Sequence, residues 1–435
     1  MNRIAYSERI CQALKKVLYV GNGTMDHPLD SFIRLGARYM LQTALEQEVQ
    51  EFLGRAHYKR GARQNFGYRN GYKPRNLKSA DGILQVAIPQ IRDTNEDFRS
   101  KLVKKLKNGS DVLNKLVTEM YIRGLSCADV ENSFLDVFGR KIISKSGVSK
   151  ITKHLYEEFD SWKKRDLSKY NIVYLFLDGI YLAMRQGTSE KECVLCAYGI
   201  TSDGKKILLH LSLGEKESYS AWLGFLHEMV ERGLNAPLLI INDGNSGLRK
   251  AIREVFPKSL RQRCQVHKMR NILSKLPENA IAKMKTLVHQ VFYAKGYKEG
   301  IHKGRRLIER FKNLYPSAME CLEKDLEETL THLKFPEKHH KFIRTTNLLE
   351  RTFEEGRRRT KVIPRFKTEK SCLKLVFAVL IRVSQNWKGL RMTPNITEKL
   401  DKIHRELFGC DIVTPKVQQP ECIQQMQPAV ATAVC

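Results

Sequence analysis

The spacing of apolar and polar residues along the 435-residue chain predicts a mainly helical first part. Residues 29–53 carry apolar side chains at the spacing of a helix. A strand-like run, GILQVAIPQ, follows at 82–90, and residues 110–160 predict three helices joined by tight turns. Residues 1–28 show little pattern. We therefore expect an N-terminal extension over 1–28 and a helical, basic region over 29–165.

The three helices predicted within 110–160 have the outline of a helix-turn-helix module. The second is expected to begin at Ser126, a residue type favoured at helix N-caps, and the third near Ser146. Lys145, Lys150 and Lys153 lie at the start of the third helix. A basic leading end is typical of a helix that contacts DNA, although any small helical bundle can give the same pattern.

From residue 171 the pattern changes to short apolar runs typical of strands. Three such runs come first, and helices then alternate with two further strands, up to LRQRCQVH. This order predicts an α/β core with a mixed sheet, and it is the order of the ribonuclease H-like fold. In that fold the first and fourth strands lie side by side, which would bring Asp178 and Asp243 together.

The catalytic core is expected to be discontinuous in sequence, formed by 166–267 and 344–395. Between these parts, 268–343 is Lys-rich and shows no alternation of the strand type, so we expect an all-helical insertion. Residues 396–435 form a C-terminal extension. Its last 25 residues are rich in Gln, Pro and Ala and are expected to be disordered.

The charge of the chain indicates a polyanionic partner. Lys and Arg number 76 against 47 Asp and Glu, a net charge of +29. Nucleic acid is the favoured partner, and a membrane surface is the weaker interpretation. No apolar run reaches the roughly 18 residues of a membrane span. The N-terminus lacks a signal-peptide core, so we expect an intracellular, cytoplasmic protein whose ten cysteines stay reduced.

Two aspartates follow apolar strand-like runs, Asp178 in YLFLDGIY and Asp243 in PLLIINDG, and each precedes a glycine. Two carboxylates at the ends of neighbouring strands repel one another unless a cation lies between them. Mg²⁺ prefers such ligands, and two metal ions can hold both oxygens of an in-line phosphoryl transfer. A third acid is usually needed. Glu350 is our candidate, with Glu354 and Glu355 as rivals one turn on.

Other interpretations of these residues stay open at this point. Asp-Gly after a strand is also an ordinary turn signal. Glu350 can complete a capping box with Asn347. The cluster Arg357, Arg358 and Arg359 suits a grip on DNA near the cleaved phosphate, but three arginines also commonly form a solvated surface.

Further DNA contacts are predicted away from the acidic residues. Arg69, Lys73 and Arg75 are interleaved with aromatics in GARQNFGYRNGYKPRN (61–76), which suits phosphate contact and stacking. A charged, solvated loop is the alternative. Trp222, on the helix between the two aspartates, is a candidate for stacking on a splayed base, although a tryptophan on an amphipathic helix commonly belongs to the core.

Three cysteine and histidine spacings suggest metal ligands. Cys193 and Cys196 lie on a predicted strand, where residues three apart point to opposite faces, so we assign both to the core. The pair His339–His340 is the second spacing. Cys264 and His267 lie where a strand gives way to a helix, so a local structural pair, with zinc as a less favoured option, is possible there.

Five segments in order resemble the Mutator-type transposases of bacterial insertion sequences. The resemblance runs from about residue 30 to about residue 392, and its segments are LDGIYL, SYSAWLGFLHEMVERGL, LLIINDGNSGL, CQVHKMRNIL and RTTNLLERTFEEGRRRTKVIPRF. It implies a DDE transposase with a ribonuclease H-like core. Asp178 and Asp243 then match the two family aspartates, Glu350 matches the family glutamate, and Cys264 and His267 match the C-x-x-H signature.

The resemblance implies that the protein nicks DNA at terminal inverted repeats and transfers a 3′ hydroxyl onto a target phosphodiester. Two Mg²⁺ or Mn²⁺ ions on Asp178, Asp243 and Glu350 would support this chemistry. Synapsis of two ends implies at least a homodimer. A nuclease or resolvase of the same fold without strand transfer, and a non-catalytic transposase-derived DNA-binding protein, are the rival functions.

Overall fold

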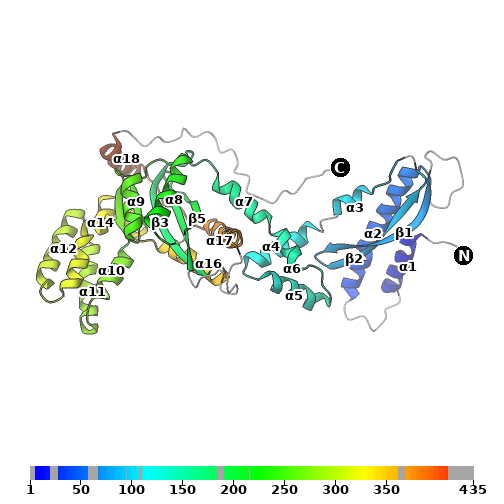
Figure 1. Cartoon of the computed structure of the whole chain (residues 1–435), viewed down its shortest axis with the longest axis horizontal. Coiled ribbons are helices and arrows are strands. Elements are labelled where there is room, and N and C mark those ends of the chain that lie inside the picture. Colours follow the sequence, from blue (N-terminus) through cyan, green and yellow to red (C-terminus); the bar gives the residue numbers. More distant parts are fainter. Residues whose placement is uncertain are drawn as a thin grey trace. The chain divides into compact units, whose positions relative to one another are not determined.

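The computed structural model describes residues 5–19, 28–56, 67–94, 96–106, 110–183, 191–214, 216–360 and 368–409. The chain divides into two compact units, Met1–His154 and Leu155–Cys435. Figure 1 shows the helices and strands of both units and labels many of them. The predicted disorder of the last 25 residues falls outside the described residues.

The first unit begins with two packed helices, α1 (Tyr6–Tyr19) and α2 (Pro28–Leu53). The helix predicted over 29–53 is thus confirmed as α2, whereas α1 lies in a stretch where the sequence showed little pattern. α1 is fastened to α2 by polar contacts: Ser7 Oγ donates to Glu46 Oε2 at 2.6 Å, and Arg38 donates to the Tyr6 hydroxyl at 3.1 Å. Ile10, Leu14 and Val17 recur at helical spacing, and Ile10 is buried, so α1 also has an apolar face that the sequence interpretation missed.

A β-hairpin follows, formed by β1 (Tyr68–Ser79) and β2 (Gly82–Arg92). β2 confirms the strand predicted at 82–90. Residues 68–76 of the 61–76 stretch belong to strand β1, so the alternative interpretation of this stretch as a solvated loop does not hold for them. β1 contains Gly, Pro, Asn and Lys, which are poor strand formers, and it is extended because it pairs with β2. The Gln42 side chain bonds both the N–H and the C=O of Ala87 at 2.9 Å, which holds α2 against β2.

After the short helix α3 (Lys101–Leu106) come α4 (Asp111–Ile122), α5 (Cys127–Phe138) and α6 (Lys145–Ile151). Ser126 caps α5, as predicted. The third helix differs from its prediction, because Ser144 is its N-cap and it ends at Ile151. There the Thr152 hydroxyl donates to the Val148 carbonyl at 3.0 Å. Such side-chain bonds compete with helix continuation, and a separate helix, α7 (His154–Lys163), follows.

The second unit contains a five-stranded mixed sheet in the order β5-β4-β3-β6-β7. The strands are β3 (Ile172–Ala183), β4 (Lys191–Thr201), β5 (Lys206–Gly214), β6 (Leu239–Asn242) and β7 (Leu260–Arg263). The first three form an antiparallel meander, whereas β6 and β7 run parallel to β3. The predicted α/β organisation, with the first and fourth strands as neighbours, is therefore confirmed. The expected end of the first strand at Asp178 was wrong, since β3 continues beside β4 to Ala183.

Helices and aromatic side chains cover both faces of this sheet. On one face α8 (Tyr219–Glu231) and α9 (Ser246–Val255) bury Trp222, Phe225 and Ile252 against Leu175 and Leu177 of β3. The opposite face carries aromatic side chains that pack on segments from later in the chain. The ring pairs are Phe176–Tyr198, Tyr198–Trp387, Tyr174–Phe335 and Tyr174–His339. The unit is therefore built in layers around the sheet.

Every regular element between β7 and residue 344 is helical, as predicted. These elements are α10 (Gln265–Leu273), α11 (Glu278–Phe292), α12 (Tyr297–Phe311), α13 (Pro316–Lys324), α14 (Leu326–Leu330), the 3-10 helix η1 (Thr331–Lys334) and α15 (Glu337–Ile343). They bury a core of their own, which includes Val288, Phe292 and Met319. Arg249 of α9 joins this bundle to the sheet, because its guanidinium pairs with Asp325 at 2.7 Å and with Glu328 at 3.1 Å.

The last described helices are α16 (Asn347–Thr360), α17 (Glu369–Ser384) and α18 (Pro394–Phe408). Among the described residues, none of the helices combines the length and the apolar character needed to cross a lipid bilayer.

A buried histidine in the bundle makes the stability of this unit sensitive to acid. His332 is 1% exposed, and burial, followed by the charges of His340 and Arg344, lowers its pKa from 6.5 to about 3. The unfolded chain takes up a proton near pH 6.5, whereas the folded chain does not, so acidification favours unfolding. We expect a loss of about 2 kcal/mol of stability between pH 7 and pH 5 from this residue.

Thermal melting from pH 7 to pH 5 tests this expectation. His332→Gln removes one titrating group and should reduce the pH dependence, although buried His210, whose pKa burial lowers to about 4, still contributes to it. His302→Gln, at an exposed position of α12, is the matched control and should melt like the wild type at each pH. An unchanged pH slope in His332→Gln would contradict the assignment.

Candidate active site

Two aspartates lie side by side where β6 ends. In the parallel β3–β6 pair Leu177 is in register with Asn242, so Asp178 and Asp243 are the next residues of adjacent chains, and neighbouring strands are about 4.8 Å apart. Asp178 is 8% exposed, and Asp243 is half-buried. The Oδ1 atom of Asp243 accepts a hydrogen bond from the Asn245 backbone N–H at 3.0 Å, which fixes its side chain at the start of α9.

The surroundings of Asp178 oppose its negative charge. Burial raises the pKa of this carboxyl well above its usual range, and the neighbouring charges of Asp243 and Glu350 raise it further. The Gly179 N–H and the nearby His267 act in the opposite direction without cancelling the rise. The site therefore has more negative charge than its own protein groups neutralise, and a bound cation would be favourable here.

The glycine after each aspartate is explained by a side chain that approaches it closely. At Gly179 a Cβ atom would lie 2.4 Å from the Glu217 carboxylate and 2.7 Å from the Cys193 sulfur. At Gly244, which has φ +89°, a Cβ would overlap the guanidinium of Arg263. The Asp-Gly pairs are thus not simple turns, because each glycine leaves room for a charged group beside the aspartates.

Glu217 is a fourth acidic residue at this site, and the sequence interpretation missed it. It lies in the segment before α8, where its Oε2 accepts a hydrogen bond from the Asn245 side chain at 3.2 Å. Burial, followed by the charge of Asp243, raises the pKa of Glu217. Its segment, GEKES, follows a predicted strand and carries no periodic signal, so only the folded sheet reveals its place at the site.

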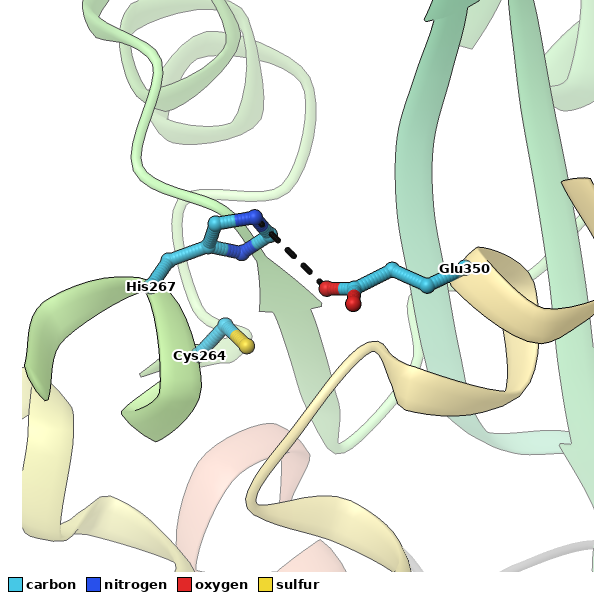
Figure 2. A group of neighbouring side chains, drawn as sticks. All are labelled: Cys264, His267 and Glu350. Carbon is cyan, nitrogen blue, oxygen red and sulfur yellow. Dashed lines mark ion pairs between the residues drawn. The ribbon is translucent and has the colours of Figure 1, made fainter. Parts of the chain in front are cut away.

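Glu350 reaches the site from the first turn of α16. Figure 2 shows its carboxylate directed at the His267 ring, with Nε2 and Oε1 3.5 Å apart. The Thr346 hydroxyl lies 3.3 Å from the same carboxylate oxygen and 3.5 Å from the Cys264 sulfur. Of the two rivals, Glu355 pairs with Arg358 at 2.8 Å, and Glu354 is exposed.

Cys264, His267 and Glu350 form a compact group of potential metal ligands. Their ligand atoms all lie within 4.8 Å of one another. Among the described residues, this is the group of at least three His, Cys, Asp or Glu side chains close enough to share one metal ion. Asp178 and Asp243 are outside it. Burial opposes ionisation of Cys264 and is the largest single influence, but the hydrogen bonds of His267 and Thr346 together with the His267 charge lower the Cys264 pKa. The same bond raises the pKa of His267 to about 9.

The remaining candidates within this unit have different surroundings. Arg358 and Arg359 pair with Glu355, and Arg357 is exposed on the same last turn of α16. Trp222 is 0% exposed in the core under α8, so no face of its ring is open for a base, and a stacking role is not supported. Its large apolar ring fills the space between α8 and the sheet.

The other cysteine and histidine pairs have structural surroundings. Cys193 and Cys196 are fully buried on β4, as expected of core residues. The His339 Nδ1 is 2.8 Å from the Tyr174 hydroxyl, and the His340 Nε2 is 2.8 Å from the Phe335 carbonyl.

The basic candidates of the first unit are on surface elements. Lys145, Lys150 and Lys153 are exposed on and just after α6. On β1, Lys73 is exposed, whereas Arg75 and Arg69 are partly buried. Arg69 donates to the Arg55 carbonyl at 2.9 Å, so part of its role is to hold the hairpin against the end of α2.

The known proteins to which this chain is similar are named as transposases. The chain matches a family described as "Transposase, Mutator family" over residues 12–389. The transposase for insertion sequence element ISRM5 of Rhizobium meliloti is 33% identical over 351 residues, 80% of this chain and 87% of the relative. The transposase for IS406 of Burkholderia multivorans is 32% identical, covering 80% and 90% of the two chains.

A third relative, the transposase for IS256 in transposon Tn4001 of Staphylococcus aureus, is 30% identical over 347 residues, which are 79% of this chain and 87% of the relative. The family match covers the two aspartates, Glu350 and the whole helical bundle between them. The chain therefore belongs to the Mutator family of transposases.

Proposed function

We propose that this protein is the DNA transposase of an insertion sequence, which nicks DNA at the terminal inverted repeats and transfers the 3′ hydroxyl to a target strand. The observation that carries the proposal is the parallel β3–β6 pairing, which puts Asp178 next to Asp243 while α16 brings Glu350 toward them. The relatives named as insertion sequence transposases support the same function.

The catalytic core is proposed to be ribonuclease H-like. Its support is the sheet order β5-β4-β3-β6-β7, in which an antiparallel meander is followed by two parallel strands. The two α/β connections cross one face of the sheet as α8 and α9. In this arrangement the first and fourth strands of the core are neighbours, which accounts for two acids 65 residues apart meeting at one place.

Mg²⁺ or Mn²⁺ fits the acidic residues, because carboxylate oxygens suit these ions and Asp178 lies in a site deficient in positive charge. When bound, two such ions would supply charge neutralisation at the cleaved phosphate. Asp178 and Asp243 would hold them, with Glu350 as the third ligand. Residues that would hold two ions between them need not all lie within the spacing of a single-ion site.

Cys264 and His267 are proposed to position Glu350 and not to bind zinc. The His267 ring holds one carboxylate oxygen of Glu350, and the Thr346 hydroxyl contacts both Glu350 and Cys264. A zinc ion bound by Cys264, His267 and Glu350 would use the Glu350 carboxylate. That carboxylate would then not be available to the ions held by Asp178 and Asp243. A cationic His267 beside Cys264 needs no metal to explain its contacts.

DNA is the proposed partner of both units. The net charge of +29 supports an extended contact with phosphates. Arg357, Arg358 and Arg359 lie on the helix that carries Glu350, so contacts there would bring the strand near the acids. Lys145, Lys150 and Lys153 would contact the terminal repeat. Synapsis of two ends would require at least two copies of the chain.

The first prediction for this function concerns the three acids. Asp178→Ala, Asp243→Ala and Glu350→Ala should each lower Mg²⁺-dependent joining of a terminal-repeat oligonucleotide to a plasmid by about 1,000-fold or more, because each removes a ligand of the ions. Binding of the repeat should change little. A gel assay of joined product, with a mobility-shift assay on the same oligonucleotide, measures both.

Glu354→Ala is the matched control, since Glu354 is an exposed acid one turn further along α16. It should retain joining. Activity in Glu350→Ala together with loss in Glu354→Ala would overturn the assignment of the third acid. Cleavage without joining by the wild type would favour a nuclease, and binding alone would favour a non-catalytic DNA-binding protein.

The second prediction concerns the metal. Elemental analysis of the purified protein should find no stoichiometric zinc, and Cys264→Ser should lower the joining rate by about 10-fold while the Mg²⁺ dependence of the remaining activity stays similar, because the loss acts through the position of Glu350. One tightly bound zinc per chain that disappears in Cys264→Ser would contradict the positioning role.

The third prediction concerns α6. Neutralising Lys145, Lys150 and Lys153 together should weaken repeat binding and reduce the slope of log affinity against log salt by about 0.9 for each phosphate that the protein no longer neutralises. A triple substitution at Lys388, Lys399 and Lys402, which are exposed in the other unit, removes the same charge and should leave the slope nearer the wild type. Equal effects of the two triple variants would indicate only a general loss of charge.

A further inference from the structure

A cavity of about 560 Å³ lies between α10 and α11 and has no part in the site described above. Its size is that of a small-molecule pocket. The apolar part of its lining consists of Val266, Met269, Leu273, Ile281 and Phe292. These side chains offer a flat or apolar ligand a place away from water.

The polar side chains that line this pocket are all basic or neutral. Arg270, Lys285 and His289 line it and are exposed, and the lining contains no Asp or Glu. Thr345 and Ser274 add hydroxyl groups. An apolar interior with a cationic rim is complementary to a ligand that joins a flat apolar part to an anionic part.

Planar groups are stacked at one side of the pocket. The rings of His289 and Tyr293 are nearly parallel, with centroids 3.8 Å apart, and the Arg344 guanidinium lies 4.2 Å from the Tyr293 ring centroid. Tyr293 is 47% exposed, although it is a large ring. Nucleobases stack on aromatic rings and on guanidinium groups, so this stack is a surface on which a base can be added.

The pocket adjoins the residues that position Glu350. Gln265 and Val266 line it and directly precede His267, and Thr345 directly precedes Thr346. The Gln265 backbone N–H donates to the Arg344 carbonyl at 3.0 Å, which ties the start of α10 to the segment before α16. A nucleotide in the pocket would therefore belong to the DNA next to the cleaved bond.

We propose that this pocket binds one unstacked nucleobase of the DNA strand beside the cleaved phosphodiester. The base stacks on His289, whose other face lies on the Tyr293 ring, and Arg270 and Lys285 contact the phosphates that flank it. Capture of this base fixes the register of the strand, so that a single phosphate faces the acidic residues. The proposal rests on the transposase function and names a nucleotide contact within the bundle.

Variants at Tyr293 give the first test. On an intact terminal-repeat duplex, Tyr293→Ala should reduce cleavage between about 10- and 100-fold, because loss of the ring that backs His289 removes the base–aromatic stack, and Tyr293→Phe should retain the rate. Phe342→Ala, at a ring that is 41% exposed and outside the pocket, is the matched control and should also retain it. The same variants should be compared on a duplex with an abasic site at each position flanking the cleaved bond.

At one flanking position the abasic duplex should slow the wild type and bring its rate to that of Tyr293→Ala, since neither pair retains the stack. The proposal is wrong if Tyr293→Ala cleaves the intact duplex like the wild type. It is also wrong if, at every position, the abasic site lowers the cleavage rate of Tyr293→Ala by the same factor as that of the wild type. An inactive wild type would instead reject the transposase function itself, so the two failures are distinguishable.

A crosslinking experiment on the wild-type protein avoids dependence on how the variants fold. A terminal-repeat duplex with 5-iododeoxyuridine placed at successive flanking positions is irradiated in the complex, and crosslinked peptides are mapped. A crosslink from one position to residues 289–293 or 265–274 is expected. Crosslinks confined to other parts of the chain would overturn the proposal.

Discussion

The parallel pairing of β3 with β6 is the constraint on which the candidate site depends. It puts Asp178 beside Asp243 with one of the two almost fully buried, an arrangement that is unfavourable for two negative charges. The pairing survives because the strands are held by the apolar layer under α8 and α9. Core packing therefore supplies the stability that keeps a repulsive pair of acids together, and this excess of negative charge is what makes the site receptive to cations.

The third acid is positioned by a chain of small contacts at the start of α16. Thr346 contacts both Cys264 and Glu350, and His267 holds the Glu350 carboxylate. Cys264 follows β7 directly, so its buried sulfur is one of the contacts that tie the start of α16 to the end of β7. The helical bundle inserted between β7 and α16 can vary internally without moving Glu350, provided that these contacts at its two ends persist.

The apolar periodicity of the sequence was sufficient to predict the α/β core and the helical bundle. The neighbouring positions of Asp178 and Asp243 followed from the order of the strands and helices, compared with that of the ribonuclease H-like fold. Features that depend on tertiary contacts could not be predicted this way. β1, which contains poor strand formers, is extended because β2 pairs with it. Glu217 lies outside any periodic segment, and its relation to Gly179 exists only once β3 is folded. Trp222 shows another limit of the sequence pattern. Its spacing on a helix did not decide whether its ring lies in the core or contacts DNA.

The side chain of Gln262 on β7 has a consequence for how this unit behaves in solution. Its amide donates to the Thr329 carbonyl at 2.8 Å and accepts from the His332 N–H at 2.6 Å, as a neighbouring strand's peptide group would. β7 is the last strand of the sheet, and such borders are where separate molecules join into aggregates. By covering that edge, the inserted helices also prevent the sheet from pairing with another molecule. A chain that lacks these helices would expose an unpaired edge strand and would be prone to aggregate.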